Sequence, residues 1–209
     1  MSGLSASKLT CIKRDRLLFT ELSLQVSKGE LLYLRGPNGA GKTSLLRILT
    51  GLTMPEEGEV CFDGLSIFSP DSTYTDHLVY LGHKSALNSM MSAVENLQYW
   101  AAQHSVSLSL QKLYDVLETL GLVGLEDVPV KFLSAGQQRR VALSRLWLKP
   151  AELWVLDEPF TALDVEGIAL LESLFASHCS DGGMIITTSH QALSPSAGKH
   201  QVFDLEYSL

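Results

Sequence analysis

Residues 36–43 read Gly36-Pro37-Asn38-Gly39-Ala40-Gly41-Lys42-Thr43 and are followed by Ser44. This stretch fits the pattern G-x-x-x-x-G-K-[ST], in which glycines precede a lysine and a hydroxyl residue. A short apolar run at 31–34 comes before it, and apolar residues three or four positions apart follow it between 45 and 52. The spacing predicts a strand, a tight turn and a helix, which is the arrangement that a phosphate-binding loop requires.

Each residue type in this stretch has its own task in phosphate binding. Glycines let the backbone turn tightly enough for successive N–H groups to face an anion, and the positive end of the following helix points at the same anion. Lys42 is expected to neutralise the β- and γ-phosphates of a nucleotide, and Thr43 is expected to ligate Mg²⁺. The alternative, a strand–turn–helix with incidental glycines, is rejected because a chance match to the pattern is rare in a chain of this length, and this match lies between an expected strand and an expected helix. We therefore predict that residues 36–44 bind a nucleotide.

A pair of carboxylates follows a second apolar run. Leu153-Trp154-Val155-Leu156 is expected to form a buried strand, and Asp157-Glu158-Pro159 comes directly after it. Ligands of open α/β sheets bind at the carboxyl ends of the strands. Asp157 is expected to hold Mg²⁺ directly or through water, and Glu158 to polarise the attacking water. An acidic pair alone more often caps the next helix, but beside a phosphate-binding loop it favours ATP hydrolysis.

A second loop of small residues precedes another expected helix. It reads Leu133-Ser134-Ala135-Gly136-Gln137. A helix that starts at such a loop is a candidate anion site, although in isolation a serine N-cap before an amphipathic helix explains the same residues. The next basic pair, Arg139 and Arg140, is interpreted as a solvated helix face.

The remaining chain alternates between strand and helix patterns. Strands are expected at 22–26, 31–34, 59–62, 78–81, 153–156 and 184–187. Helical spacing occurs at 94–100, at 113–120 and from Gly136 to Lys149-Pro150. The sequence therefore predicts an α/β fold, organised as a single domain over 1–209 with a mostly helical subdomain at about 84–150.

Composition narrows the classes of function. The chain has 209 residues, 45% of them hydrophobic, and a formal net charge of −7, which argues against nucleic acid as a partner. Its three cysteines form no CxxC pair, which disfavours a zinc or redox centre. The start MSGLSASKLT has no apolar export signal, and no stretch approaches the roughly 18 apolar residues of a membrane helix. We expect a cytoplasmic protein that serves any membrane from its surface.

The order of these motifs resembles the ABC ATPase family over essentially the whole chain. The phosphate-binding loop, a helical insertion, LSAGQ at 133–137, Asp157-Glu158 and a distal His190 follow one another as they do in that family. The resemblance implies a P-loop NTPase of the ABC type. It also implies ATP and Mg²⁺ as cofactors, and two copies that close head-to-tail around two ATP molecules.

The resemblance assigns further roles by motif. Leu133–Gln137 matches the signature, so that Ser134 and Gly136 would contact the γ-phosphate held by Lys42 of a second copy. Asp164, at the end of Thr161-Ala162-Leu163-Asp164, matches the D-loop that communicates across the dimer. His190 matches the switch histidine that senses the γ-phosphate.

Two positions depart from the family pattern. His83 stands where the family usually has a glutamine that reaches Mg²⁺ and the attacking water; either a catalytic role or a hinge role fits it. Most members also carry an aromatic residue near the N-terminus that stacks on adenine. The stretch Cys11–Arg14 has none, and the first aromatic is Phe19. Stacking by Arg14 and a purely apolar contact remain alternatives.

Longer stretches are similar to a narrower group, the ATP-binding subunits of bacterial cytochrome c maturation systems, which are often called haem exporter ATPases. The stretches are LSAGQQRRVALSRLWL at 133–148, LWVLDEPFTALD at 153–164, and Gly82-His83. This resemblance implies integral membrane subunits as partners and a peripheral location on the cytoplasmic face of the inner membrane. Met90 and Met91 are candidates for docking that partner, with ordinary core filling as the favoured alternative.

Three other functions fit part of the pattern. One is the ATPase subunit of another small-molecule ABC transporter. The identity of the membrane proteins that co-purify with the chain would distinguish that function from cytochrome c maturation. A soluble ABC ATPase of nucleic-acid or translation machinery is disfavoured by the single domain and the charge of −7. A nucleotide-binding module without hydrolysis is disfavoured by the presence of Lys42, Asp157, Glu158 and His190.

Overall fold

The structure is a computed structural model that describes residues 3–206. Its strands form two sheets. The first sheet has four antiparallel strands in the order β2-β1-β4-β5. Its members are β1 (Gly3–Lys13), β2 (Arg16–Ser27), β4 (Glu57–Phe62) and β5 (Leu65–Ser66). The second sheet has five parallel strands in the order β6-β7-β8-β3-β9. Its members are β3 (Leu31–Arg35), β6 (Leu78–Leu81), β7 (Leu153–Leu156), β8 (Met184–Thr188) and β9 (Gln201–Asp204).

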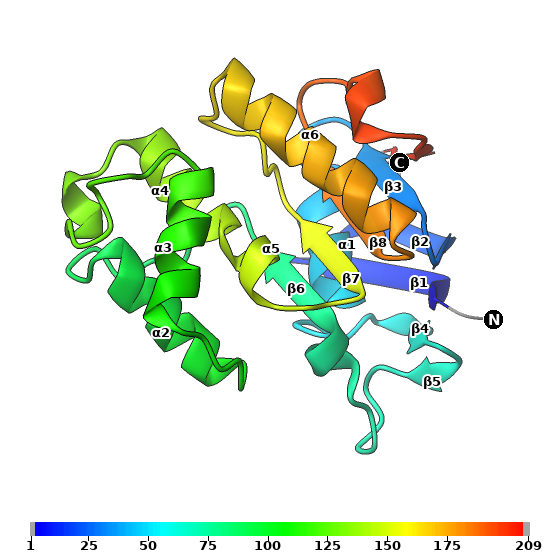
Figure 1. The fold of residues 1–209 in the computed structure, drawn as a ribbon. Coiled ribbons are helices and arrows are strands. Elements are labelled where there is room, and N and C mark those ends of the chain that lie inside the picture. Colours follow the sequence, from blue (N-terminus) through cyan, green and yellow to red (C-terminus); the bar gives the residue numbers. More distant parts are fainter. Residues whose placement is uncertain (1–2, 207–209) are drawn as a thin grey trace.

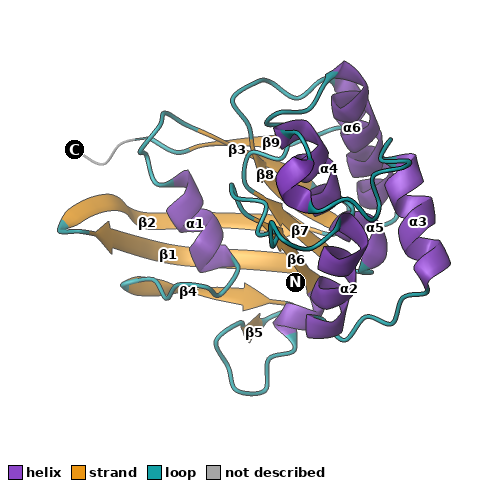
Figure 2. Cartoon of the chain, turned by 90° about the vertical axis from the view of Figure 1, so that its left-hand side faces the viewer, coloured by secondary structure: helices purple, strands orange, loops and turns teal. Residues whose placement is uncertain are grey.

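The parallel sheet is covered on both faces, because successive side chains of a strand point to opposite sides. Leu32 and Leu34 of β3 belong to a core shared with helix α1 (Lys42–Leu49) and with the antiparallel sheet. Leu31 and Tyr33 of the same strand belong to a second core with helix α6 (Val165–Ser180). Figure 2 shows α1 lying over β1 and β2, and Figure 1 shows α6 along the parallel strands.

Within the described part of the chain, a third core contains no strand residue. It joins α2 (Ala93–Gln103), α3 (Leu110–Thr119) and α4 (Ala135–Leu143). In Figure 1 these three helices stand to one side of the parallel sheet. All three begin at serine caps. The hydroxyls of Ser92, Ser109 and Ser134 accept from the backbone N–H groups of Glu95, Lys112 and Gln137, respectively. Short 3₁₀ turns complete the element order: η1 (Tyr74–His77), η2 (Val130–Phe132) and η3 (Pro195–Ala197).

The helix expected from Gly136 to Lys149 is two helices. The first, α4, ends before Ser144, whose hydroxyl donates to the carbonyl of Val141, and α5 (Arg145–Leu148) follows. Side-chain bonding of this kind to the preceding turn bends a helix. The break lets Leu146 pack against the parallel sheet while Leu148 packs in the helical core.

The strands expected at 22–26, 31–34, 59–62, 78–81, 153–156 and 184–187 are present. The mixed α/β class, with its parallel sheet, is confirmed. The longest of the described helices, α6, has 16 residues. Within residues 3–206, no helix combines the length and the apolar character that crossing a bilayer demands.

Candidate ATP-binding and hydrolysis site

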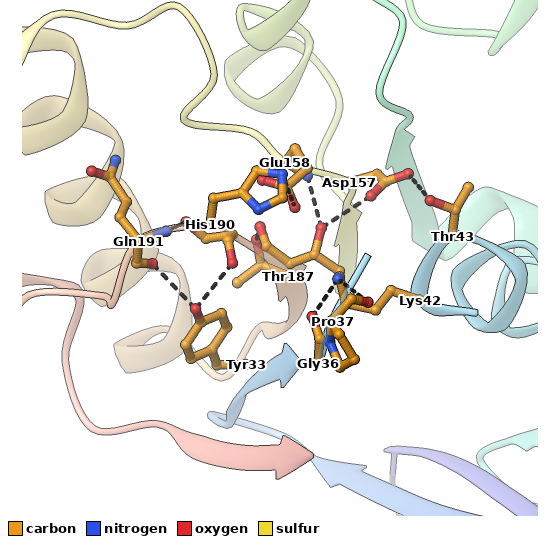
Figure 3. Close-up of polar contacts among 12 residues, drawn as sticks. Tyr33, Gly36, Pro37, Lys42, Thr43, Asp157, Glu158, Thr187, His190 and Gln191 are labelled. Carbon is orange, nitrogen blue, oxygen red and sulfur yellow. Dashed lines mark hydrogen bonds and ion pairs between the residues drawn. The ribbon is translucent and has the colours of Figure 1, made fainter. Parts of the chain in front are cut away.

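The glycine-rich loop joins β3 to α1 at the carboxyl edge of the parallel sheet. Gly36 is required there by close packing, because a Cβ atom at this position would lie 2.2 Å from the carbonyl oxygen of Leu205. Lys42 donates from Nζ to the carbonyls of Gly36 at 2.6 Å and Pro37 at 3.2 Å (Figure 3). Gly41 is the N-cap of α1 and makes no side-chain cap, so the first N–H groups of the helix are left for an anion.

Asp157 lies at the end of β7 between two hydroxyl groups. Thr43 donates to its Oδ2 at 2.9 Å, and Thr188 of β8 donates to its Oδ1 at 3.0 Å. Within residues 3–206, no three His, Cys, Asp or Glu side chains cluster closely enough to hold a metal ion by themselves. The neighbouring oxygens of Thr43 and Asp157 nevertheless fit Mg²⁺, which commonly takes one or two protein oxygens and completes its shell with phosphate and water.

Glu158 has a backbone conformation that is unusual for a residue with a side chain. Its φ of 53° lies in the left-handed region, and its N–H donates to Thr188 Oγ1 at 2.9 Å. The carboxylate Oε1 lies 3.5 Å from Nε2 of His190. The Glu158 side chain is only 10% exposed, whereas that of His190 is 66% exposed. Two residues far apart in the sequence thus face each other at the edge of the sheet (Figure 3).

The loop that carries His190 is held by a buried tyrosine. The hydroxyl of Tyr33 donates to the carbonyls of Ser189 at 3.1 Å and Gln191 at 3.2 Å, one on each side of His190 (Figure 3). Burial raises the pKa of Tyr33, so the hydroxyl keeps the proton that it donates. The backbone at His190 is therefore anchored although its side chain is exposed.

A cavity of about 400 Å³ opens between these groups. Its wall includes most of the residues expected to bind nucleotide or to catalyse hydrolysis. They are Asn38, Gly39, Gly41, Lys42, Thr43, Ser44, His83, Asp157, Glu158 and His190. Gly36, Pro37 and Ala40 shape the loop without lining the cavity. Lys13 and Leu18 complete the wall, whereas Arg14 is not part of it. Lys13 and Leu18 are therefore the N-terminal residues that a nucleobase in this cavity could contact.

The loop 133–137 lies at a second cavity of about 390 Å³. Ser134 accepts from the backbone N–H of Gln137 at 3.2 Å, and Gln137 Oε1 accepts from that of Ser134 at 2.8 Å, so this loop is a complete capping box. Ser134, Gly136 and Gln137 line the cavity, and Leu133 is buried in the third core. The two cavities share no lining residue, so Ser134 and Lys42 of one chain do not face the same space.

Asp164 connects the second cavity to α6. It caps this helix by accepting from the backbone N–H of Gly167 at 2.9 Å, and its carboxylate also pairs with Arg140 at 2.5 Å. These contacts, that of Gly167 first, lower the pKa of Asp164. Gly136 lies close to the backbone just before Asp164, since a Cβ atom on Gly136 would lie 2.7 Å from the carbonyl oxygen of Ala162.

The interpretation of Arg139 and Arg140 as a solvated face is wrong. Arg139 is buried, and Arg140 is paired with Asp164. The pattern gave the wrong answer because α4 is covered on the side of Arg139 by the turn after β7, which its own periodicity does not reveal. Thr188 and Tyr33 were not identified as site residues either. A hydroxyl at the end of the apolar run 184–187 was the available signal for Thr188, whereas nothing in the sequence singles out Tyr33.

We expect Lys42→Ala to weaken ATP binding by about 2–3 kcal/mol, roughly 30- to 150-fold, because one charge-assisted contact to phosphate is lost. A titration with a fluorescent ATP analogue measures the change. Lys28→Ala is the matched control, since Lys28 pairs with Glu152 away from the cavity and should leave affinity unaltered. Unchanged binding by Lys42→Ala would contradict the assignment of the phosphate-binding loop.

Comparisons with known proteins agree with this geometry. The model of the ABC transporter family matches residues 19–161. A cytochrome c biogenesis ATP-binding export protein CcmA from Idiomarina loihiensis is 52% identical over 98% of this chain and 93% of its own length. The CcmA of Methylococcus capsulatus is 50% identical over 91% of this chain and 92% of its own length.

Solved structures share the fold. A putative ABC transporter ATP-binding protein from Pyrococcus furiosus is 26% identical, with a TM-score of 0.82 and 98% of both chains covered. A dimeric ATP-binding cassette in a post-hydrolysis state, bound to ADP and Pi, has a TM-score of 0.81 at 22% identity, over 99% of this chain and 97% of its own. The chain belongs to the ABC transporter family of ATP-binding proteins and, within it, to the CcmA family of cytochrome c biogenesis ATP-binding export proteins.

Proposed function

We propose that this chain is the ATP-hydrolysing subunit of a bacterial inner-membrane ABC transporter that handles haem during cytochrome c maturation. The main support is the cavity where the phosphate-binding loop meets Asp157, Glu158 and His190. The chain that forms this cavity is 52% identical in sequence to a CcmA protein. In this function, ATP binding and hydrolysis drive a separate membrane subunit.

The residues around the cavity support a division of labour in hydrolysis. Backbone N–H groups of the loop and the start of α1 bind phosphate, and Lys42 exchanges its carbonyl contacts for phosphate oxygens. Thr43 and Asp157 would hold Mg²⁺, which neutralises charge on the phosphates when bound. Glu158 orients and polarises the attacking water, and His190, 3.5 Å from it, senses the γ-phosphate.

His83 lines the same cavity and is exposed, which favours a role at the nucleotide over that of a hinge. An imidazole there can accept or donate a hydrogen bond to water near the phosphates. Lys13 and Leu18 supply the contacts to the base, in place of a stacking aromatic ring. An aliphatic and cationic surface offers no donor–acceptor pattern that is specific to adenine.

We propose further that two copies of the chain complete each ATP site. The separation of the two cavities supports this arrangement, because Ser134 and Gly136 reach no phosphate held by Lys42 of the same chain. A head-to-tail pair would bring the second cavity of one copy over the first cavity of the other. Asp164 and Arg140, at the rim of the second cavity, would then lie next to the partner's nucleotide.

The partners in the membrane are proposed to be the integral membrane subunits of the same system, with this chain peripheral on the cytoplasmic face. The helical subdomain at about 84–150 is the part proposed to meet them. Core filling is the wrong interpretation of Met90, which is 66% exposed, whereas Met91 is half-buried. Lys131 contacts both the sulfur of Met90 and the ring of the exposed Phe132. An exposed methionine and an aromatic ring give an adaptable apolar contact.

Complementation tests the function. In the source bacterium with the chromosomal copy deleted, a plasmid copy of the chain should restore haem-stained c-type cytochromes, and Glu158→Gln at the same protein level should not. Normal cytochromes in the deletion strain would indicate another small-molecule transporter. Full restoration by Glu158→Gln would mean that hydrolysis at this site is not what the system uses.

A further inference from the structure

One buried guanidinium connects three segments that surround the catalytic edge. Arg139 of α4 is 4% exposed. Its Nη2 donates to the carbonyls of Asp157 at 3.1 Å and Glu158 at 2.7 Å, and its Nε donates to that of Pro159 at 3.1 Å. Its Nη1 donates to the carbonyl of Gly82, directly before His83, at 3.2 Å. The helix of the signature loop is thus bonded to the turn that carries Glu158 and to the segment that carries His83.

The burial of this charge is costly and is not needed to fill space. An ionised side chain that leaves water needs good hydrogen bonds in return, and an apolar side chain of the same size would avoid the cost. Burial lowers the pKa of Arg139, against the opposing effect of the charges of Asp157 and Glu158. The acceptors are four backbone carbonyls, which are bonded by three different nitrogens of the planar guanidinium. A lysine has a single ammonium nitrogen and could not reach all four.

The contacts fall where the backbone is strained. Glu158 has a φ of 53°, and such a conformation persists only where the surroundings impose it. Thr188 fixes the N–H of Glu158, and Arg139 fixes the carbonyls of Asp157, Glu158 and Pro159. The turn is therefore held from both sides, by the neighbouring strand β8 and by α4.

We propose that Arg139 is a positioning residue, which holds the Glu158 turn in the geometry needed for hydrolysis and ties that geometry to the position of the signature helix. A movement of α4, for example when Ser134 engages a second copy's ATP, would reach the Glu158 turn through the three hydrogen bonds to Asp157, Glu158 and Pro159. The inference rests on the proposed role of Glu158 in activating water. It gives Arg139 no contact with the nucleotide, and Arg139 does not line the cavity.

The chain offers a matched control at the end of the adjoining helix α5. Lys149, directly after α5, is 6% exposed, and its Nζ donates to the carbonyls of Thr75 at 2.8 Å and Leu78 at 3.0 Å. Burial lowers its pKa as well. Lys149→Met therefore removes a buried cation with carbonyl acceptors, as Arg139→Met does, but leaves the Glu158 turn untouched.

The test compares Arg139→Met, Arg139→Lys and Lys149→Met with the parent chain for ATP affinity, KM, kcat and Tm. We expect Arg139→Met to keep ATP affinity and KM within about twofold and to lose about 10- to 100-fold in kcat, as a displaced catalytic group does. Arg139→Lys should fold and still lose kcat, because one ammonium cannot reach all four carbonyls. Lys149→Met should lower Tm by a similar amount and keep kcat.

A double-mutant cycle separates positioning from general destabilisation. On the Glu158→Gln background, Arg139→Met should cause no further loss of the residual turnover, because the group that Arg139 positions is already disabled. A full additional loss on that background, or equal losses of kcat in Arg139→Met and Lys149→Met, would overturn the inference. Normal turnover in Glu158→Gln itself would instead refute the proposed role of Glu158, so the two failures are distinguishable.

Discussion

Glu158→Gln is expected to bind ATP with the affinity of the parent chain and to hydrolyse it about 100-fold more slowly or worse. Glutamine keeps the size of the side chain and the backbone contacts to Thr188 and Arg139, but it cannot take a proton from water. The two quantities to measure are the affinity for a fluorescent ATP analogue and the steady-state release of phosphate.

Glu172→Gln controls for the loss of a buried carboxylate. Glu172 is 5% exposed on α6 and accepts from the backbone N–H of Ser194 at 2.8 Å, so its replacement affects stability and not chemistry. Turnover should remain near that of the parent in this control. If Glu158→Gln hydrolysed ATP as fast as the control, the group that activates water would have to be elsewhere.

Ser134→Arg is expected to leave ATP binding by one chain intact and to abolish hydrolysis that depends on pairing. An arginine at this position would fill part of the second cavity, where a second copy's phosphate is proposed to enter. It would also remove the N-cap of α4, which costs about 1 kcal/mol of stability. The rate of hydrolysis per chain, measured over a range of protein concentrations, should rise with concentration for the parent and stay flat and low for the variant.

Ser109→Arg controls for the loss of a helix N-cap in Ser134→Arg. Ser109 begins α3 and accepts from the backbone N–H of Lys112 at 3.2 Å, so Ser109→Arg removes an equivalent cap away from the cavity. Its concentration dependence should match that of the parent. Normal hydrolysis by Ser134→Arg would refute the shared-site arrangement.

The sequence predicted the parts of the fold whose signal is local. The runs 31–34, 78–81 and 153–156 are nearly all apolar because parallel strands are covered on both faces. It did not predict β1 or β9. In β1 the residue Lys8 has a φ of 51°, and the register with β2 shifts beside it, so the alternation of apolar and polar residues is interrupted. The edge strand β9 is short and largely exposed.

The candidate site shows the same division between local and tertiary information. Lys42, Thr43, Asp157 and Glu158 were predicted as site residues because each belongs to a motif with a local chemical reason, and all four line the first cavity. The supports of these residues come from other elements: Thr188 from the strand beside β7, and Arg139 from α4. Which strand lies beside which, and which face of a helix is covered, are decided by tertiary packing, so spacing within one segment does not contain them.

If this chain drives membrane subunits of cytochrome c maturation, as we propose, those subunits should be recovered together with it. A tagged Glu158→Gln chain, held with ATP by its slow turnover, is used with Mg-ATP to capture proteins from solubilised native membranes, and mass spectrometry identifies them. We expect integral membrane proteins of the cytochrome c maturation system, which should be absent from a parallel capture with Lys42→Ala. Recovery of an unrelated permease alone, or of soluble partners only, would contradict it.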